Sequence, residues 1–132
     1  NCFSEDTGLE VIALNGDPGV KSARYAGENR SFKANIEKLL QKMGTTENRH
    51  ARFRTIISLI LDQKEIQFEG ICEGEIIMEE RGQNGFGYDP VFIPEGSMLT
   101  WAEMNTIEKS GYSHRKKAMD KLIVFLQSIK ES

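Results

Sequence analysis

The chain has 132 residues and a formal net charge of −3, with 28% charged and 39% hydrophobic residues. This length suits one domain, residues 1–132, and this balance predicts a packed core rather than a disordered chain. The absence of a lysine and arginine block argues against a protein that binds nucleic acid by neutralising phosphates. No apolar run approaches the length of a membrane span, and no secretory signal is present, so we expect no membrane partner and a cytoplasmic protein.

The first half of the chain predicts a strand, a turn and a helix. Residues 9–14 are mostly apolar and β-compatible, and a cluster of turn formers follows at residues 15–19. Apolar residues then recur at helical spacing over residues 32–43. Ser31 is placed to cap this helix, and Gly44 suits its C-terminal end.

The second half predicts a long antiparallel hairpin followed by a helix. Residues 51–61 alternate along one face, and we expect the end of this strand to be buried on both faces. Residues 65–81 form its partner, in which Gly70 and Gly74 indicate a bulge or a bend. The last helix begins after Ser113, which can cap it. The pattern predicts an α/β or α+β domain with a long twisted mixed sheet, in which helices flank the central hairpin.

Two glycines, two aromatic rings and a carboxylate crowd the segment from Gly85 to Pro90. Glycine allows unusual dihedrals and a close approach of the backbone to a ligand. The rings of Phe86 and Tyr88 offer π-faces, and Asp89 offers hydrogen-bond acceptors. This combination suits a planar polar heterocycle such as a nucleobase, and a purely structural turn is the alternative.

Adjacent acids precede Thr7 and Gly8 near the start of the chain. Carboxylates such as Glu5 and Asp6 can hold Mg²⁺, which keeps several waters and bridges to substrate phosphates. A carboxylate can also orient or deprotonate an attacking water. A solvated acidic turn is the alternative interpretation.

His114 and Arg115 fall in the first turn of the last helix. Cations there oppose the helix dipole, so we interpret both side chains as donors to a ligand carbonyl or phosphate. The alternative is a surface histidine beside an arginine that pairs with a nearby acid. Taken alone, Lys109 is typical of a surface lysine, and Trp101 is typical of a core or lid residue.

These segments occur in an order that resembles the inosine triphosphate pyrophosphatase family, also called the Ham1 family. The matching segments span nearly the whole chain; they are Ser4 to Val11, Pro18 to Gly27, Gly85 to Phe92 and Glu108 to Arg115. Each is moderately specific, and the four together are highly specific.

The resemblance implies a two-lobed fold with the active site in the cleft between the lobes, and a homodimer. It implies Mg²⁺-dependent hydrolysis of ITP, dITP or XTP to the nucleoside monophosphate and pyrophosphate, which removes damaged nucleotides from the pool. Asp6 would be the metal-linked general base, with Glu5 as a further metal ligand. The substrate would contact Thr7, Phe86, Gly87, Tyr88, Asp89, Lys109, His114 and Arg115, with Phe86 stacked on the purine.

A physical hypothesis then explains how such a site would select deaminated purines over adenine. Hypoxanthine and xanthine carry a carbonyl at position 6, where adenine carries an amine. Donors from His114 and Arg115 would satisfy the carbonyl and would face the amine donor to donor. Guanine shares the 6-carbonyl, and its rejection has no explanation in these residues.

The chain departs from the family pattern at two places. Glu5 stands where the family usually has a second aspartate. The family's N-terminal phosphate-binding motif and the metal-binding glutamate that follows it are both missing. We therefore expect the C-terminal portion of such an enzyme, severely impaired on its own and exposing apolar surface that the missing segment would cover.

Three alternatives stay open at this point. The first is a Maf-like pyrophosphatase that acts on pyrimidine or modified nucleotides. The second is a nucleotide-binding module without catalysis. The third is a structural fragment that binds nothing.

Overall fold

A single antiparallel sheet organises the molecule. The computed structural model describes residues 2–19, 21–27, 31–85 and 87–131. The strands are β1 (Cys2–Val11), β2 (Pro18–Gly19), β3 (His50–Leu61), β4 (Lys64–Ile76) and β5 (Phe92–Pro94), in the spatial order β2-β1-β3-β4-β5. The α-helices are α1 (Phe32–Met43), α2 (Thr106–Ser110) and α3 (His114–Glu131).

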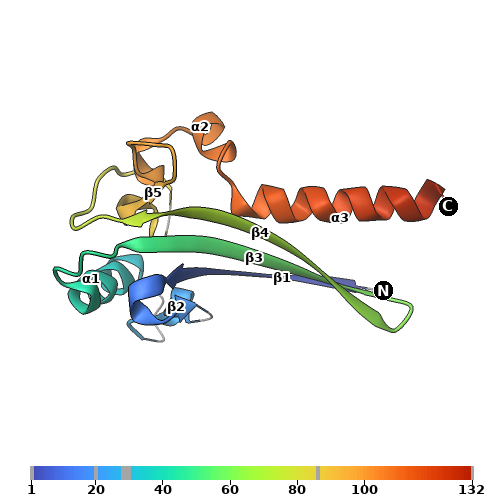
Figure 1. The fold of residues 1–132 in the computed structure, drawn as a ribbon, viewed down its shortest axis with the longest axis horizontal. Coiled ribbons are helices and arrows are strands. Elements are labelled where there is room, and N and C mark those ends of the chain that lie inside the picture. The colour runs from blue at the N-terminus through green and yellow to red at the C-terminus, as the bar shows by residue number, and fades with distance from the viewer. Residues whose placement is uncertain (1, 20, 28–30, 86, 132) are drawn as a thin grey trace.

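The predicted mixed sheet is wrong, because all of the described neighbouring strands pair antiparallel. Val11, at the end of β1, pairs with Ala51, at the start of β3. The connection that contains α1 therefore returns the chain to the same end of the sheet, where α1 lies in Figure 1. A parallel pair would need a crossover to the opposite end.

β3 and β4 form the predicted hairpin, with an unbroken register from His50–Glu75 to Leu61–Lys64. Its two loop residues, Asp62 and Gln63, have positive φ values of 51° and 67°, as tight hairpin turns require. Of the predicted bulge or bend, the bulge is wrong, because pairing continues through both strand glycines. β4 also ends at Ile76, earlier than the sequence pattern predicted.

One face of β3 carries the core. Its buried residues alternate as predicted, namely Ala51, Phe53, Thr55, Ile57 and Leu59. The opposite face was expected to become buried toward the end of the strand, and this is wrong, because Ile60 is exposed. Arg52 and Arg54 on that face form ion pairs with Glu10 of β1.

The beginning of the chain differs from its predicted secondary structure. The strand β1 starts at Cys2 and ends at Val11, and residues Ile12–Leu14 form a 3-10 turn rather than the end of a strand. Asn15 follows in the left-handed conformation, with φ 56°. This tight turn reverses the chain so that β2 can pair with Leu9 and Glu10.

The helix α1 begins where the sequence predicts. The Ser31 side chain accepts a hydrogen bond from the Ala34 amide at 3.2 Å, and the Gly44 amide closes the other end by donating to the Leu40 carbonyl. Leu39 and Met43 pack into the main core with the buried residues of β1 and β3. The cap and the apolar stripe are local features, and both follow from residue spacing.

Ser31→Ala is expected to lower the free energy of unfolding by about 1 kcal/mol, because one amide in the first turn of α1 loses its acceptor. Urea unfolding measures the change. Ser128→Ala is the matched control, since the Ser128 hydroxyl donates to the Phe125 carbonyl within α3. We expect it to change stability by less than about 0.5 kcal/mol. Equal losses in both variants would contradict the capping role of Ser31.

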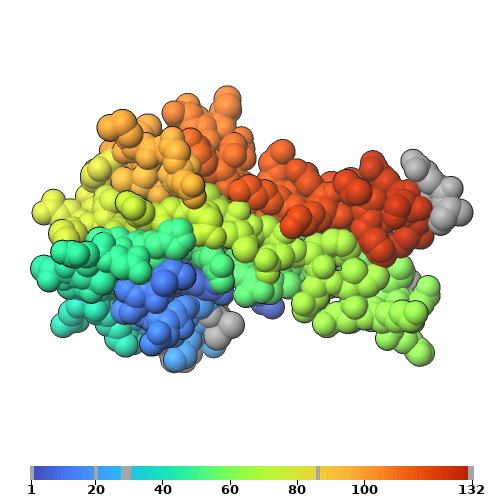
Figure 2. All heavy atoms as spheres, viewed as in Figure 1, coloured from blue at the N-terminus to red at the C-terminus, as the bar shows by residue number. Residues whose placement is uncertain are grey.

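The helix α3 lies along β4 and β3 (Figure 1). Ala118 and Leu122 pack on Ile57 and Leu59 in a second core cluster. Figure 2 shows an elongated molecule with α3 on one long side. Exposed apolar side chains remain on α3, namely Ile123, Val124, Leu126 and Ile129. None of the described helices is long and apolar enough to cross a membrane.

Candidate nucleotide site

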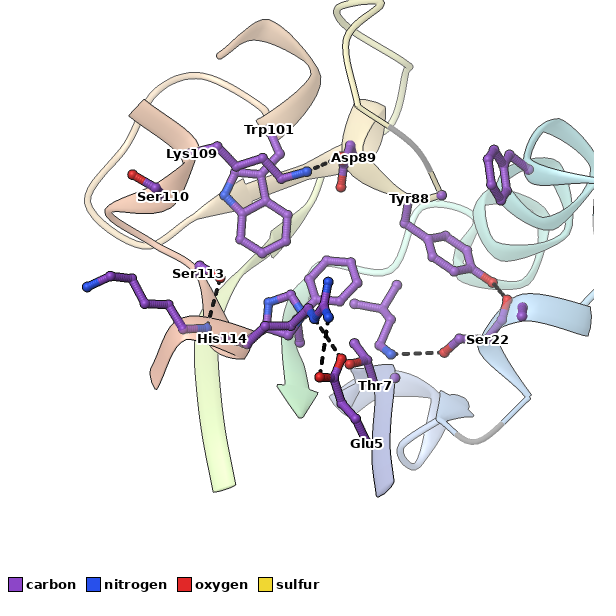
Figure 3. A pocket seen from close by; sticks show the side chains of 18 of the residues that line it. Glu5, Thr7, Ser22, Tyr88, Asp89, Trp101, Lys109, Ser110, Ser113 and His114 are labelled. Atoms are coloured by element: carbon purple, nitrogen blue, oxygen red, sulfur yellow. Dashed lines mark hydrogen bonds and ion pairs between the residues drawn. The ribbon is translucent and has the colours of Figure 1, made fainter. Parts of the chain in front are cut away.

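A cavity of about 640 Å³ opens between β1, β3, the loop before β5 and the start of α3. Figure 3 shows side chains from these elements converging on it. Every predicted substrate-binding residue that the structure describes lines this cavity; these are Thr7, Gly87, Tyr88, Asp89, Lys109, His114 and Arg115. Phe86, the predicted base-stacking residue, lies outside the described residues. Ser22 and Ala23 also line the cavity, so residues from all four matching sequence segments meet at one place.

Three rings form a stack in the cavity wall. Phe53 lies 4.9 Å from Trp101 and 5.2 Å from His114 between ring centroids, with interplanar angles of 30° and 19°. Trp101 and His114 are 5.5 Å apart at 22°. Phe92 meets the edge of the stack, at 4.8 Å from Phe53 and 79°. Trp101 is 1% exposed, so it is a core residue as predicted, and it also lines the cavity.

His114 is a neutral side chain at physiological pH. Burial lowers its pKa to about 4, and the positive charges of Arg115, Lys109 and Lys117 lower it further. Its Nδ1 atom is buried and has no hydrogen-bond partner among the described residues. Nε2 is therefore the ring nitrogen that can reach a ligand in the cavity. His114 is therefore not a second cation beside Arg115, but the neutral ring can still donate one hydrogen bond to a ligand.

Lys109 lines the cavity and is not an isolated surface lysine. Its Nζ lies 2.6 Å from Oδ2 of Asp89, whose side chain is only 6% exposed. The same ammonium lies 5.5 Å from the centroid of the Trp101 ring. Gly85, with φ 80°, passes so close to the Asp89 carboxylate that a Cβ atom would overlap it. This position therefore needs glycine, both for its dihedral and for its space.

Glu5 and Arg115 form a second ion pair at the cavity. Arg115 contacts both carboxylate oxygens, with Nε 2.6 Å from Oε1 and a terminal nitrogen 3.2 Å from Oε2. Beside this pair, the Thr7 and Thr55 hydroxyls share a hydrogen bond of 2.8 Å. The α3 end of the cavity therefore has a positive group held against β1 (Figure 3).

Asp6 is not brought together with these residues. Side chains alternate between the two faces of a strand, and Glu5 and Thr7 both line the cavity. Asp6 therefore projects from the opposite face of β1, where it is exposed. Adjacent residues with opposite directions cannot hold one ion from one side, so Glu5 and Asp6 do not fit the predicted metal-ligand pair. Among the described residues, no three His, Cys, Asp or Glu side chains form a metal-binding group.

Tyr88 joins two loops at the edge of the cavity. It is buried, and its hydroxyl donates to the Ser22 carbonyl at 2.6 Å (Figure 3). Burial is the main cause that raises the pKa of this hydroxyl, and electrostatic interaction with Tyr25 raises it further. The Ser22 hydroxyl in turn accepts from the Leu9 amide at 2.9 Å. Tyr88 thus holds the cavity wall together through its hydroxyl.

Asn35 is a cavity residue that the sequence analysis missed. Its side-chain oxygen accepts from the Ala26 amide at 2.8 Å, and its amide nitrogen donates to the Ala23 carbonyl at 3.1 Å. It is buried on α1, beside Ile36. An amide at a buried position of an apolar helix stripe is the signal that could have indicated this role, because a buried polar group needs partners.

Comparisons with known proteins agree with the four segments that form the cavity. A protein-family model described as the Ham1 family matches residues 1–125. A protein of Christiangramia forsetii named dITP/XTP pyrophosphatase is 52% identical over 126 residues, which are 96% of this chain and 66% of that protein. A protein of the same name from Porphyromonas gingivalis is 53% identical over 126 residues, covering 95% of this chain and 65% of that protein.

Solved structures show the same similarity in three dimensions. The structure of the Staphylococcus aureus Ham1 protein has a TM-score of 0.91 at 47% identity, and covers 96% of this chain and 66% of that one. A HAM1 protein from Coxiella burnetii has a TM-score of 0.90 at 38% identity, covering 96% and 66%. The chain spans about two thirds of the length of these relatives. With the family model matching nearly all of its residues, the chain belongs to the Ham1 family.

Proposed function

We propose that this chain binds the base of a deaminated purine nucleoside triphosphate and takes part in its hydrolysis to the monophosphate and pyrophosphate. The observation that carries the proposal is the meeting of one ring stack and two ion pairs in a single cavity. Its volume of about 640 Å³ is within the range of small-molecule sites. Relatives that bear the name dITP/XTP pyrophosphatase support the substrate class.

The cavity suits a 6-oxopurine better than an aminopurine. A neutral His114 presents at most one N–H donor, while the Arg115 guanidinium presents several donors and no acceptor. A carbonyl at position 6 can accept from both groups, whereas the adenine amine would bring its own donors against the donors of the Arg115 guanidinium. A buried donor left without an acceptor costs about 1–3 kcal/mol, and such mismatches set specificity.

Asp6 is the proposed general base. In this role it would take the proton of a water whose oxygen attacks the α–β phosphoanhydride, and the anhydride bond would break to release pyrophosphate. β2 pairs only with Leu9 and Glu10, so residues 2–8 of β1 have no second neighbour among the described strands. A nucleotide with its base in the cavity would extend its phosphates across this edge to reach Asp6.

Asp6→Asn is expected to lower the rate of pyrophosphate release from ITP by about 10²–10⁴-fold, the usual contribution of a general base. Glu5→Gln is the matched control, because it removes a carboxylate charge at the position next to Asp6. It removes the carboxylate charge that holds Arg115, so we expect a raised KM with a smaller change in kcat. Release of pyrophosphate from ITP, with ATP as the comparison substrate, measures both variants.

Two outcomes would contradict this proposal. Equal turnover of ITP and ATP would exclude recognition of the 6-carbonyl, and an Asp6→Asn variant with wild-type turnover would exclude Asp6 as the base. If the chain binds IMP but releases no pyrophosphate from ITP, it acts as a nucleotide-binding module. That second function is favoured by the place of Asp6, which lies on the strand face opposite the cavity.

The remaining family features stay predictions. A Mg²⁺ requirement is tested by omitting the ion from the assay. The described residues alone form no group of three His, Cys, Asp or Glu side chains that could hold it. The homodimer, the two-lobed arrangement with a cleft and the cytoplasmic location are further predictions of the family resemblance. Sedimentation of the purified chain tests the dimer.

A further inference from the structure

Gly70 of β4 lies directly beneath the first turn of α3. A Cβ atom at this position would overlap the carbonyl oxygen of His114 and would lie 2.5 Å from the amide nitrogen of Ala118 and 3.0 Å from Cβ of Lys117. Residues four apart are the two ends of a helical hydrogen bond. The strand therefore touches the backbone of the helix at its first hydrogen-bonded turn, a distance that only glycine allows.

Two lysines hold α3 in register on the same part of β4. Nζ of Lys117 donates to the Ile71 carbonyl at 2.8 Å, and Nζ of Lys121 donates to the Glu69 carbonyl at 2.6 Å. These carbonyls belong to the residues on either side of Gly70. Ala118 is fully buried against the sheet between the two lysines. The close contact at Gly70 thus sets the depth of the helix, and the lysines set its register.

We infer that Gly70 is the positioning residue that seats the first turn of α3 and so fixes where His114 and Arg115 lie in the cavity. Both side chains line the cavity, and Arg115 reaches Glu5 across it. Gly70 itself is not among the described residues that line the cavity, so its effect on the cavity must pass through the helix α3. The consequence for nucleotide binding rests on the proposed function, whereas the placement of His114 can be measured without any ligand.

The shift of the α3 backbone expected in Gly70→Ala is large enough to affect ligand binding. Non-bonded carbon contacts lie near 3.5–4.0 Å, so an alanine at position 70 would push the helix backbone outward by about 1 Å or more. A misplacement of about 1 Å at a binding group can cost on the order of 10²-fold in function. The burial of the His114 ring would decrease at the same time.

Gly70→Ala tests the inference through the His114 titration followed by NMR. His50 is the other histidine of the chain, and His50→Gln assigns the signals. In the wild-type chain burial lowers the pKa of His114 to about 4. In Gly70→Ala we expect this pKa to rise toward its ordinary value of about 6.5, and the Kd for IMP to rise by about tenfold or more.

Two glycine variants serve as controls. Gly111→Ala places its Cβ 3.5 Å from the Glu108 carbonyl oxygen, an ordinary contact, at an ordinary φ of −65°, so it should behave as the wild type. Gly74→Ala lies on the same strand, but its Cβ would meet Ile93 and Phe92 of β5 instead of α3. We expect it to lower stability while leaving the His114 titration low. Ala118→Val, which lifts the same turn by overpacking, should reproduce the Gly70→Ala titration if that variant does not fold.

A wild-type His114 titration in both Gly70→Ala and Ala118→Val would overturn the inference, as would an equal change in Gly74→Ala. Failure of the proposed function gives a different pattern. If the wild-type chain binds no IMP while Gly70→Ala still shifts the His114 titration, the positioning role stands and the nucleotide proposal fails. If the wild-type chain binds IMP and neither Gly70→Ala nor Ala118→Val changes the titration or the Kd, the nucleotide proposal stands and the positioning role fails.

Discussion

Lys109→Met is expected to lower the free energy of unfolding by about 3 kcal/mol and to weaken IMP binding by about tenfold. The methionine keeps the length of the side chain but removes the ammonium that lies 2.6 Å from the buried Asp89 carboxylate. Removing the ion pair of a buried carboxylate is strongly destabilising, because less of the cost of its transfer from water is then offset. Urea unfolding and an IMP titration measure the two effects.

The double variant Lys109→Met, Asp89→Asn separates this pair from general damage. It removes both charges of the ion pair, so we expect it to be more stable than Lys109→Met alone, with a coupling of at least about 1 kcal/mol. Lys116→Met is the surface control, since Lys116 lies 3.6 Å from Asp120 and both are well exposed. It should change stability by less than about 1 kcal/mol. Strictly additive effects at Lys109 and Asp89 would contradict the ion pair.

Acidification from pH 7 to pH 4 is expected to remove about 3 kcal/mol of stability through His114 alone. Burial holds the pKa of the folded ring at about 4, below the ordinary value of 6.5. Between these values the unfolded chain takes up a proton that the folded chain does not. The stability that depends on a neutral His114 is therefore fully present above about pH 6.5. It falls as the pH drops toward 4, and it is lost below pH 4.

His114→Phe checks this pH dependence, because phenylalanine keeps a ring in the stack with Phe53 and Trp101 and cannot titrate. Urea unfolding at pH 7.0, 5.5 and 4.5 should show a smaller loss of stability for this variant than for the wild type. His50→Gln should keep the wild-type loss, since His114 remains in place. The prediction fails if His114→Phe and the wild type lose stability in parallel.

Local features were predictable from the sequence. The Ser31 cap, the apolar spacing of α1 and the alternation of β3 depend on neighbouring residues, and the structure confirms them. The residues that line the cavity were predictable through the four family segments, because each segment brings its own residues to it. Ser113 also caps α3 as predicted, by accepting from the Lys116 amide at 3.1 Å.

Three features of the site could not be predicted from the sequence, because they depend on contacts between distant parts of the chain. Alternation predicts that only one of Glu5 and Asp6 faces the cavity, but the pairing of Glu5 with Ile57 on β3 decides which one. The charge state of His114 depends on its burial against Trp101 and Phe53, which come from distant parts of the chain. The strand glycines marked close contacts with α3 and β5 rather than a bulge, a distinction that needs the tertiary packing.

The binding of IMP and AMP to this chain tests the central claim, which is that the cavity recognises a 6-oxopurine. Trp101 is the single tryptophan and lines the cavity, so its fluorescence reports binding directly. We predict a saturable change with IMP, and a Kd for AMP that is at least about tenfold higher. Equal Kd values for the two nucleotides, or no saturable change with IMP, would contradict the claim.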